Sequence, residues 1–506
     1  MRALSWGVLA AVGFGLMLSS QLPKKRTDPP PPWASGFLAL GDAAPSANLE
    51  IGARIPTRLR ILHGDPFTQQ LVDALSRTDP ARKTSIEVQV LPKLIEVPVR
   101  EVADFDGWLS QGRLPEPGGD EVLAGAQTEA EASLSVAGRT LRVVGVLPPR
   151  VALFSDSFLI PAHPSLDPLF PEGDSAVHRG TLVRLGPEDF DRRETLKLIG
   201  DAYPSSNFTL VLPRSRPSRP AFRLYLGGQA LFLLGGTGLL IAAYRALARR
   251  SSWSVWAAAL NEIEHRRRLL WGVHLVYFGI YLAGALAVFE APALQKVLIA
   301  AIGGELSSEG QGPLAIAGRA YRTGNMLYAA LVTFLINFPL GSVAMISLPS
   351  LVVPGSGALL AVIRATSWGL FLSPSEAALA WMMIPHSLTL LLEGGGYILA
   401  TFFAILVPLY LLGSAPAPPR AHHPPQPEDD SPQAWNEAET ASSWRDIPFP
   451  AAAAPPPANP LPPPRSIRGR FAAAGLLNLQ GNILVAAVLA IAALYEAVEV
   501  ILMAGF

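Results

Sequence analysis

The 506-residue chain contains no cysteine and few charged side chains. The absence of cysteine excludes disulfide bonds, thiolate metal sites, a catalytic thiol and a lipid-modified cysteine. Charged residues make up 16% of the chain, against about 25% in a typical soluble protein. The 40 basic and 40 acidic residues cancel, so no positive excess points to nucleic acid. Half of the residues are hydrophobic and mean hydropathy is +0.32, which favours a membrane protein.

Sequence motifs for catalysis are also missing. The chain has no phosphate-binding loop, no H-E-x-x-H motif, no nucleophile elbow and no paired histidine cluster. We therefore expect no nucleotide hydrolysis, no cofactor, no metal site and no enzymatic activity. If the membrane region did hold a reaction centre, His386 and Glu393 would be its candidate pair.

Seven apolar stretches predict membrane spans, each of which needs about 20 residues. They cover residues 4–22, 224–244, 269–288, 326–348, 355–372, 377–412 and 471–503. The first is either a signal anchor or a cleaved signal peptide, and we favour the anchor because no clean small-x-small cleavage site lies near Ser19. The sixth exceeds one crossing, and Pro385 and the glycines at 394–396 predict a broken helix or a re-entrant segment.

Basic residues predict the orientation. Six arginines lie between the second and third spans, which by the positive-inside rule makes that loop cytoplasmic. The lysines and arginine at 24–26 oppose this assignment but are fewer. We expect a multi-pass protein of the bacterial inner membrane, with its N-terminus inside, residues 23–223 outside and its C-terminus outside.

The expected fold is a polytopic α-helical membrane protein with an α+β extracytoplasmic domain inserted after the first span. Its expected parts are a first span (1–22), the exported domain (23–223), a helical region (224–412), a cytoplasmic linker (413–470) and a last span (471–506). Strand patterns lie at 58–62, 85–91, 140–146 and 181–185, and helical patterns at 67–76 and 194–202. The linker is not expected to fold, because 16 of the 48 prolines lie between Pro416 and Pro464.

Part of the exported domain resembles a known family. Gly112–Arg113, the strand that starts at Glu121, the hairpin at 138–146 and the run at 156–161 follow one another in order. They resemble the extracytoplasmic core domain of macrolide-exporter-type (MacB-type) ABC permeases, and the order span–domain–span is similar too. The resemblance implies a permease-like subunit that works with a cytoplasmic ATPase.

The membrane region resembles a second family. Asn325 leads an apolar span, Pro385 and His386 precede Glu393, and the last span carries Glu496. These landmarks resemble the stage II sporulation protein M family of multi-span membrane proteins. This resemblance implies a scaffold that recruits exported cell-wall-remodelling proteins.

Several polar residues fall within or near the apolar spans. An ionised side chain at the centre of a bilayer costs at least about 2.5–3.5 kcal/mol, so such groups usually face the bundle interior and pair with one another. We expect Arg364 to neutralise Glu393 or Glu496, and His386 to donate to a backbone oxygen or a carboxylate. The network would serve helix packing alone, or proton or substrate handling, or Glu393 and Glu499 would meet water at the interface. The full set of intramembrane polar candidates is Arg364, His386, Glu393, Glu496, Asn325 and Asn337.

The cytoplasmic loop after the second span contains an amphipathic pattern. Trp253, Trp256 and Leu260 lie on one helical face, which predicts either a helix lying on the lipid surface or a docking helix for a cytoplasmic partner. In the linker, Trp435 and Trp444 are either a short partner-binding motif or part of a passive tether.

Together these features favour a permease-like, mechanotransmitting subunit of an ABC-type envelope complex. The alternatives are a sporulation-protein-M-like scaffold and a secondary transporter that uses the buried charges. The expected surroundings are the lipid bilayer, a cytoplasmic ABC ATPase, an extracytoplasmic protein and a second copy of the chain, but no nucleic acid.

The cysteine-free chain permits a direct test of the orientation. Single cysteines at Ala126 and Ala434 should react differently with a membrane-impermeant thiol reagent in intact cells: Ala126→Cys is labelled and Ala434→Cys is not. Equal labelling of both positions from outside would contradict the predicted topology.

Overall fold

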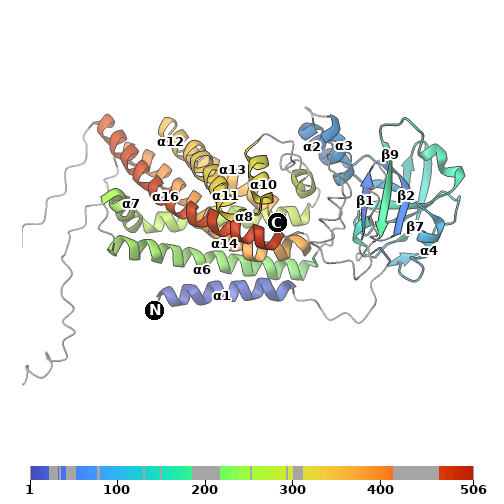
Figure 1. Cartoon of the computed structure of the whole chain (residues 1–506), viewed down its shortest axis with the longest axis horizontal. Helices are drawn as coiled ribbons and strands as arrows, with labels where there is room; N and C mark the ends of the chain where they lie inside the picture. The colour runs from blue at the N-terminus through green and yellow to red at the C-terminus, as the bar shows by residue number, and fades with distance from the viewer. Residues whose placement is uncertain are drawn as a thin grey trace, which may run out of the picture.

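The computed structural model describes residues 2–21, 32–33, 36–40, 53–76, 80–128, 132–148, 151–184, 217–250, 254–291, 294–299, 312–375, 377–413 and 466–504. The expected helix at 194–202, Trp253, Trp435, Trp444 and most of the linker lie outside these residues. A bundle of long helices and a sheet domain lie end to end (Figure 1).

Among the residues that the structure describes, six helical segments are long and apolar enough to cross a membrane. They are α1 (Arg2–Gln21), α6 (Arg219–Arg250), α8 (Arg267–Glu290), the continuous segment α11–η3–α12 (Met326–Leu335, Ile336–Ser347, Leu348–Val352), α14 (Ala377–Leu411) and α16 (Ile467–Ala504). The remaining expected span is α13 (Ser356–Phe371), an apolar helix of 16 residues. Two shorter helices, α7 (Ser254–His265) and α10 (Pro313–Arg322), lie at opposite ends of the bundle (Figure 1).

Helix α14 is the central helix, and it is continuous over 35 residues. The expectation of a broken or re-entrant segment was therefore wrong. The glycine triplet remains helical because it is a packing surface: a Cβ on Gly394 would meet Phe278 of α8, one on Gly395 would meet Leu240 of α6, and one on Gly396 would meet Leu489 of α16. Three neighbouring helices thus approach α14 where side chains are absent.

Helices α1 and α6 also meet through glycines. A Cβ on Gly13 of α1 would lie 2.4 Å from the backbone nitrogen of Phe232, and one on Gly228 of α6 would lie 2.7 Å from the carbonyl oxygen of Gly13. Gly235 faces the backbone of Trp6 and Ala10 in the same way. Because small residues let helix backbones approach closely in lipid, α1 packs against α6 over most of its length.

The segment η3 is a π-helix of 12 residues with Pro339 inside it. Proline removes a backbone donor and its ring collides with the preceding turn, so a wider helix relieves the clash. Gly341 of η3 lies against the hydroxyl group of Tyr397 on α14, where a Cβ would be 2.9 Å from that oxygen. The π-helix thus brings backbone close to a polar side chain of the central helix, as π-bulges often do at functional sites.

The sheet domain lies between α1 and α6 in the sequence. Its described residues form nine strands: β1 (Gly36–Leu40), β2 (Ala53–Ile61), β3 (Lys93–Val97), β4 (Gln111–Gly112), β5 (Glu121–Ala124), β6 (Ser133–Val136), β7 (Arg139–Val146), β8 (Ser157–Pro161) and β9 (Val177–Arg184). The order in the sheet is β1-β9-β2-β3-β8-β5-β7-β4, with β6 paired to β7. The pairs β3–β8 and β5–β7 are parallel and the others are antiparallel. The strands predicted around 58–62, 140–146 and 181–185 correspond to β2, β7 and β9.

Helices α2 (Pro66–Ser76), α3 (Pro80–Val90) and α4 (Val99–Ala103) complete the domain, together with the short 3-10 helices η1 (Ala152–Phe154) and η2 (Pro164–Leu169). The helix predicted at 67–76 is α2. The strand predicted at 85–91 was wrong, because these residues form the end of α3. Ile86 and Val90 lie four residues apart and are buried together with Val72 of α2, so packing between the helices outweighs the strand preference of β-branched residues.

Adjacent glycines on α6 provide a test of the α1–α6 contact. Gly228→Ala should lower the melting temperature of the detergent-solubilised protein, because its Cβ has no space against α1; overpacking typically costs about 1–3 kcal/mol. Gly227→Ala is the matched control: a Cβ at Gly227 meets nothing within 4 Å, and replacing a helical glycine by alanine is worth roughly 0.5–1 kcal/mol of stability. Equal melting temperatures for the two variants would contradict the contact.

Candidate functional site

An arginine and a glutamate meet in the interior of the helix bundle. Arg364 of α13 places its Nη2 atom 3.3 Å from Oε1 of Glu393 on α14. The same nitrogen donates to the hydroxyl group of Tyr397 at 2.5 Å, and that hydroxyl donates to Glu393 at 3.0 Å. The guanidinium carbon also lies 3.7 Å from the centroid of the Tyr397 ring. Of the two acidic partners considered for Arg364, the structure places Glu393 beside it.

A second pair lies nearer the start of α14. The Nδ1 atom of His386 is 3.1 Å from Oε1 of Glu499 on α16, and the hydroxyl group of Thr389 donates to the other oxygen of Glu499 at 2.7 Å. The exposed fraction of the Glu499 side chain is 6%, so this carboxyl group does not meet water at the surface. The pair joins α14 to α16.

Glu496 lies one helical turn before Glu499 and has a different environment. The hydroxyl group of Tyr321 on α10 donates to its Oε1 atom at 3.0 Å, and Tyr321 is also 2.7 Å from the hydroxyl oxygen of Thr333 on α11. The Oε2 atom of Glu496 is buried and has no hydrogen-bond partner. No arginine or histidine contacts Glu496 in the part of the chain that the structure describes.

The two asparagine candidates have other positions. Asn325 caps α11, where its side-chain oxygen accepts a hydrogen bond from the backbone nitrogen of Tyr328 at 3.0 Å. It therefore belongs to the start of that helix and not to the network. Asn337 is buried in η3, on the segment that approaches Tyr397.

Sequence reasoning missed the hydroxyl groups of the network. Tyr397 follows Glu393 by four residues and Thr389 follows His386 by three, and these spacings place both pairs on one side of a helix. That signal was present in the sequence. Tyr321 carries no such signal, because it reaches Glu496 from a separate helix.

The docking face predicted for the loop between α6 and α8 is contradicted at Leu260. Leu260 of α7 is 1% exposed and is therefore covered by the protein's own helices. Trp256 is partly buried against the same core, and Trp253 lies outside the described residues. Ion pairs and hydrogen bonds fix α7 in place: Arg245 of α6 lies 2.8 Å from Glu264, and Tyr410 of α14 donates to Glu262 at 2.6 Å.

Strands β5 and β7 of the sheet domain are held together by an acidic residue. Glu121 at the start of β5 accepts hydrogen bonds from Arg113 at 2.6 and 2.8 Å, and it also contacts Arg142 of β7. The hydrogen bonds from Arg113 lower the pKa of Glu121 to about 2. Gly112, which precedes Arg113, has a φ of 80° and lies against the backbone of Val144, so only glycine fits there.

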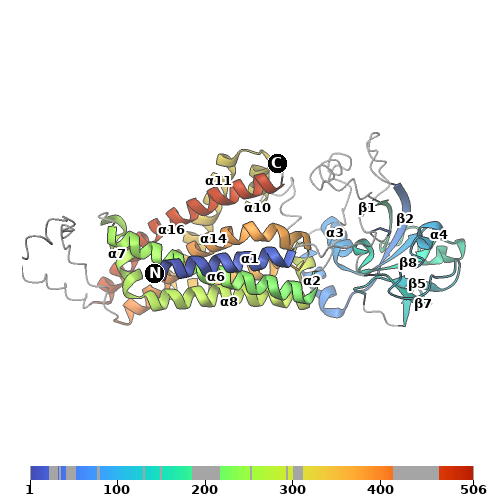
Figure 2. The ribbon, with the colours of Figure 1, turned by 90° about the horizontal axis from the view of Figure 1, so that it is seen from below.

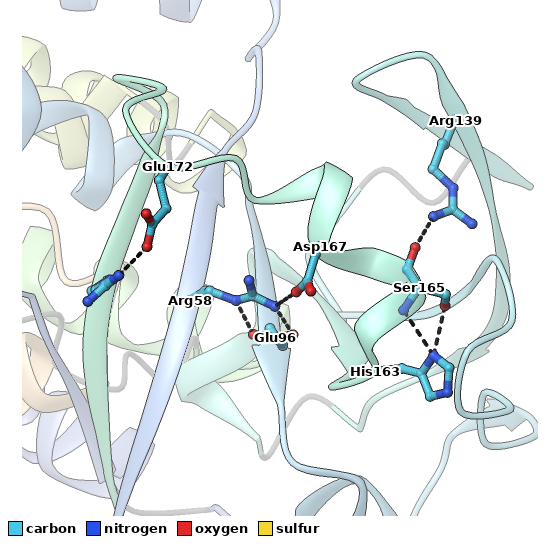
Figure 3. A network of polar contacts seen from close by, with 8 residues as sticks. Arg58, Glu96, Arg139, His163, Ser165, Asp167 and Glu172 are labelled. Atoms are coloured by element: carbon cyan, nitrogen blue, oxygen red, sulfur yellow. Dashed lines mark hydrogen bonds and ion pairs between the residues drawn. The ribbon is translucent and has the colours of Figure 1, made fainter.

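A separate network surrounds η2 (Figure 3). Arg58 of β2 lies between Glu96 of β3, at 2.6 Å, and Asp167 of η2, at 2.7 Å. His163 accepts a hydrogen bond from the backbone nitrogen of Ser165 and caps η2. These contacts have structural roles, and the described residues contain no group of three or more potential metal ligands.

The sheet domain is joined to the bundle by a partly buried ion pair. Lys296 follows α8, and its Nζ atom lies 2.8 Å from Asp156 at the edge of β8. Lys93 of β3, which is 1% exposed, approaches the same carboxylate at 3.6 Å. Burial alone would raise the pKa of Asp156, but the two ammonium groups outweigh it and hold the pKa well below its usual range. Val297 is buried with Val72 and Ile86 of α2 and α3, so residues 294–299 insert into the sheet domain.

The central pair yields a stability prediction. Arg364→Ala should lower expression and the melting temperature in detergent, because a buried charge that loses its partner typically costs about 3–5 kcal/mol. The double variant Arg364→Ala/Glu393→Gln should recover part of this loss. Ser367→Ala is the control, since that exposed residue bonds only to the carbonyl oxygen of Ile363 in its own helix. Unchanged expression and stability of Arg364→Ala would show that the pair contributes nothing.

Comparisons with protein-family models, with curated proteins and with solved structures find no match to this chain. The geometry of its own residues therefore has to carry the functional argument. That geometry is the geometry of a multi-pass helical membrane protein with a sheet domain at one end.

Proposed function

We propose that the chain is a permease-like subunit that transmits conformational change through the membrane, between an extracytoplasmic sheet domain and a cytoplasmic ATPase partner. The chain itself hydrolyses no nucleotide and works within an ABC-type envelope complex of the inner membrane. The observation that carries this proposal is the attachment of the sheet domain to the bundle at two separate places.

The first attachment is the α1–α6 pair. The sheet domain begins after α1 and ends before α6, and these two helices pack backbone against backbone at Gly13 and Gly228. Both chain connections of the domain therefore belong to one closely packed helix pair. The strands that carry the resemblance to exporter permeases, β5, β7 and β8, are neighbours in this domain.

The second attachment is the Lys296–Asp156 ion pair, which belongs to the chain after α8. A displacement of α8 relative to α6 would thus pull on the sheet domain through Asp156 and tilt it. At the opposite end of the bundle, α7 connects α6 and α14 through Glu264 and Glu262 (Figure 1). A partner that moves α7 would in this way move the helices that hold the sheet domain.

Affinity purification in mild detergent followed by mass spectrometry tests the proposal, and a stoichiometric ATPase is the expected result. In that complex, a reducible crosslinker between Asp156→Cys and Lys296→Cys should lower the ATPase rate several-fold, and reductant should restore it. The single Lys296→Cys variant treated with the same reagent is the control. The absence of any copurifying ATPase, or an ATPase rate that ignores the crosslink, would count against the proposal.

Other outcomes would favour the alternative functions. An exported hydrolase that copurifies without an ATPase would favour a scaffold that recruits cell-wall-remodelling proteins. A chain that purifies alone and transports a solute in liposomes would favour a secondary transporter. The buried pairs Arg364–Glu393 and His386–Glu499 favour this transporter over the scaffold.

A further inference from the structure

The intramembrane network contains one carboxyl group more than its cations can neutralise. Among the described residues of the network, Glu393 is paired with Arg364 and Glu499 with His386. Glu496 contacts neither cation. Its hydrogen-bond partner is the neutral hydroxyl group of Tyr321, and its second oxygen has no partner.

The surroundings of Glu496 make an unpaired charge costly. Ala497 and Ile501 of α16 form a buried apolar cluster with Ala329 and Val332 of α11 and Ala320 of α10. These apolar side chains cannot solvate a carboxylate as water does. An unsolvated carboxylate in hydrocarbon costs several kcal/mol. The unpartnered Oε2 atom is fully buried beside this cluster.

The charged groups near Glu496 reinforce the same conclusion. Glu393 and His386 approach it from α14, Tyr321 from α10, and Glu499 from its own helix. Helix α11 contributes the uncharged hydroxyl group of Thr333 through Tyr321. Two of these neighbours are carboxyl groups, and the one cation among them, His386, already contacts Glu499.

We propose that Glu496 is a proton-binding site inside the membrane region. A proton from water forms an O–H bond at Oε2, the oxygen without a partner, while Oε1 continues to accept the hydrogen bond from Tyr321. Release returns the proton to water, and no other bond is made or broken. The proposal is independent of whether the chain works with an ATPase.

Glu496 lies near the C-terminal end of α16. Glu499 follows Glu496 by three residues and so lies one turn nearer the C-terminal end of α16, which is found with α10 at the end of the bundle that faces the sheet domain (Figures 1 and 2). Glu393 lies seven residues beyond His386 on α14, which is about 10 Å deeper at the helical rise of about 1.5 Å per residue. Glu496 thus lies between the buried His386–Glu499 pair and the deeper Arg364–Glu393 pair, where a bound proton changes the balance of charge between them.

Infrared spectroscopy of the full-length protein in lipid tests the proposal directly. At neutral pH the wild type should show a carbonyl stretch of a protonated carboxyl group that shifts in D2O, and Glu496→Gln should abolish this band. Glu290→Gln is the control, because that exposed carboxyl group pairs with Arg219 outside the network and its loss should leave the band in place. A wild-type spectrum without such a band would overturn the proposal.

A second variant keeps the test valid if Glu496→Gln does not fold. Tyr321→Phe removes the hydroxyl group that donates to Oε1, so the carbonyl stretch of Glu496 should move to higher frequency without being lost. A band that is unchanged in Tyr321→Phe would not belong to Glu496, and this result would also overturn the proposal.

Discussion

A charged side chain in the hydrocarbon of a bilayer has no water around it, and the helix bundle of this protein is organised by that constraint. Glu393 is 6% exposed, so it must find its counter-charge within the protein. Arg364 supplies it from α13, and the ring of Tyr397 covers one face of the guanidinium group. Because Glu393 lies on α14, the neighbouring helices are assembled around that helix.

The close approach of those helices depends on small residues. The glycines at 394–396 leave space for side chains from α8, α6 and α16, and Gly341 of η3 leaves space for the hydroxyl group of Tyr397. Attraction between helices in lipid comes from such contacts and from hydrogen bonds, not from the exclusion of water. A polar interior and glycine-lined contacts therefore depend on each other, since polar groups can reach their partners only if the backbones are close.

Much of the architecture could be predicted from the sequence, because hydropathy and charge act locally. The stretches at 4–22, 224–244 and 269–288 correspond to α1, α6 and α8, and the insertion of a sheet domain after α1 followed from its alternating strand patterns. The continuity of α14 could not be predicted. Proline and glycine are helix breakers on local grounds, and only contacts with three other helices make glycine acceptable in this one.

In the candidate site, too, the sequence predicts part of the arrangement and not the rest. Arg364, His386 and Glu393 were recognisable because ionisable residues are rare in apolar stretches. Their pairing was not, because it depends on which faces of α13, α14 and α16 meet. Leu260 was misread for a related reason: an amphipathic face predicts burial but does not say whether lipid, a partner or the same chain covers it.

The short helix α13 has a consequence for the lipid around the protein. Its 16 residues span about 24 Å, whereas the hydrocarbon core of a typical bilayer is about 30 Å thick. Leu359 and Ile363 on this helix are exposed among the described residues, so in a bilayer lipid would meet this mismatch. Acyl chains next to α13 would have to shorten or tilt, at a cost of a fraction of a kcal/mol per Å. The protein would accordingly gather shorter-chain lipids on that flank, and the thickness of the membrane would act on the helix that carries Arg364.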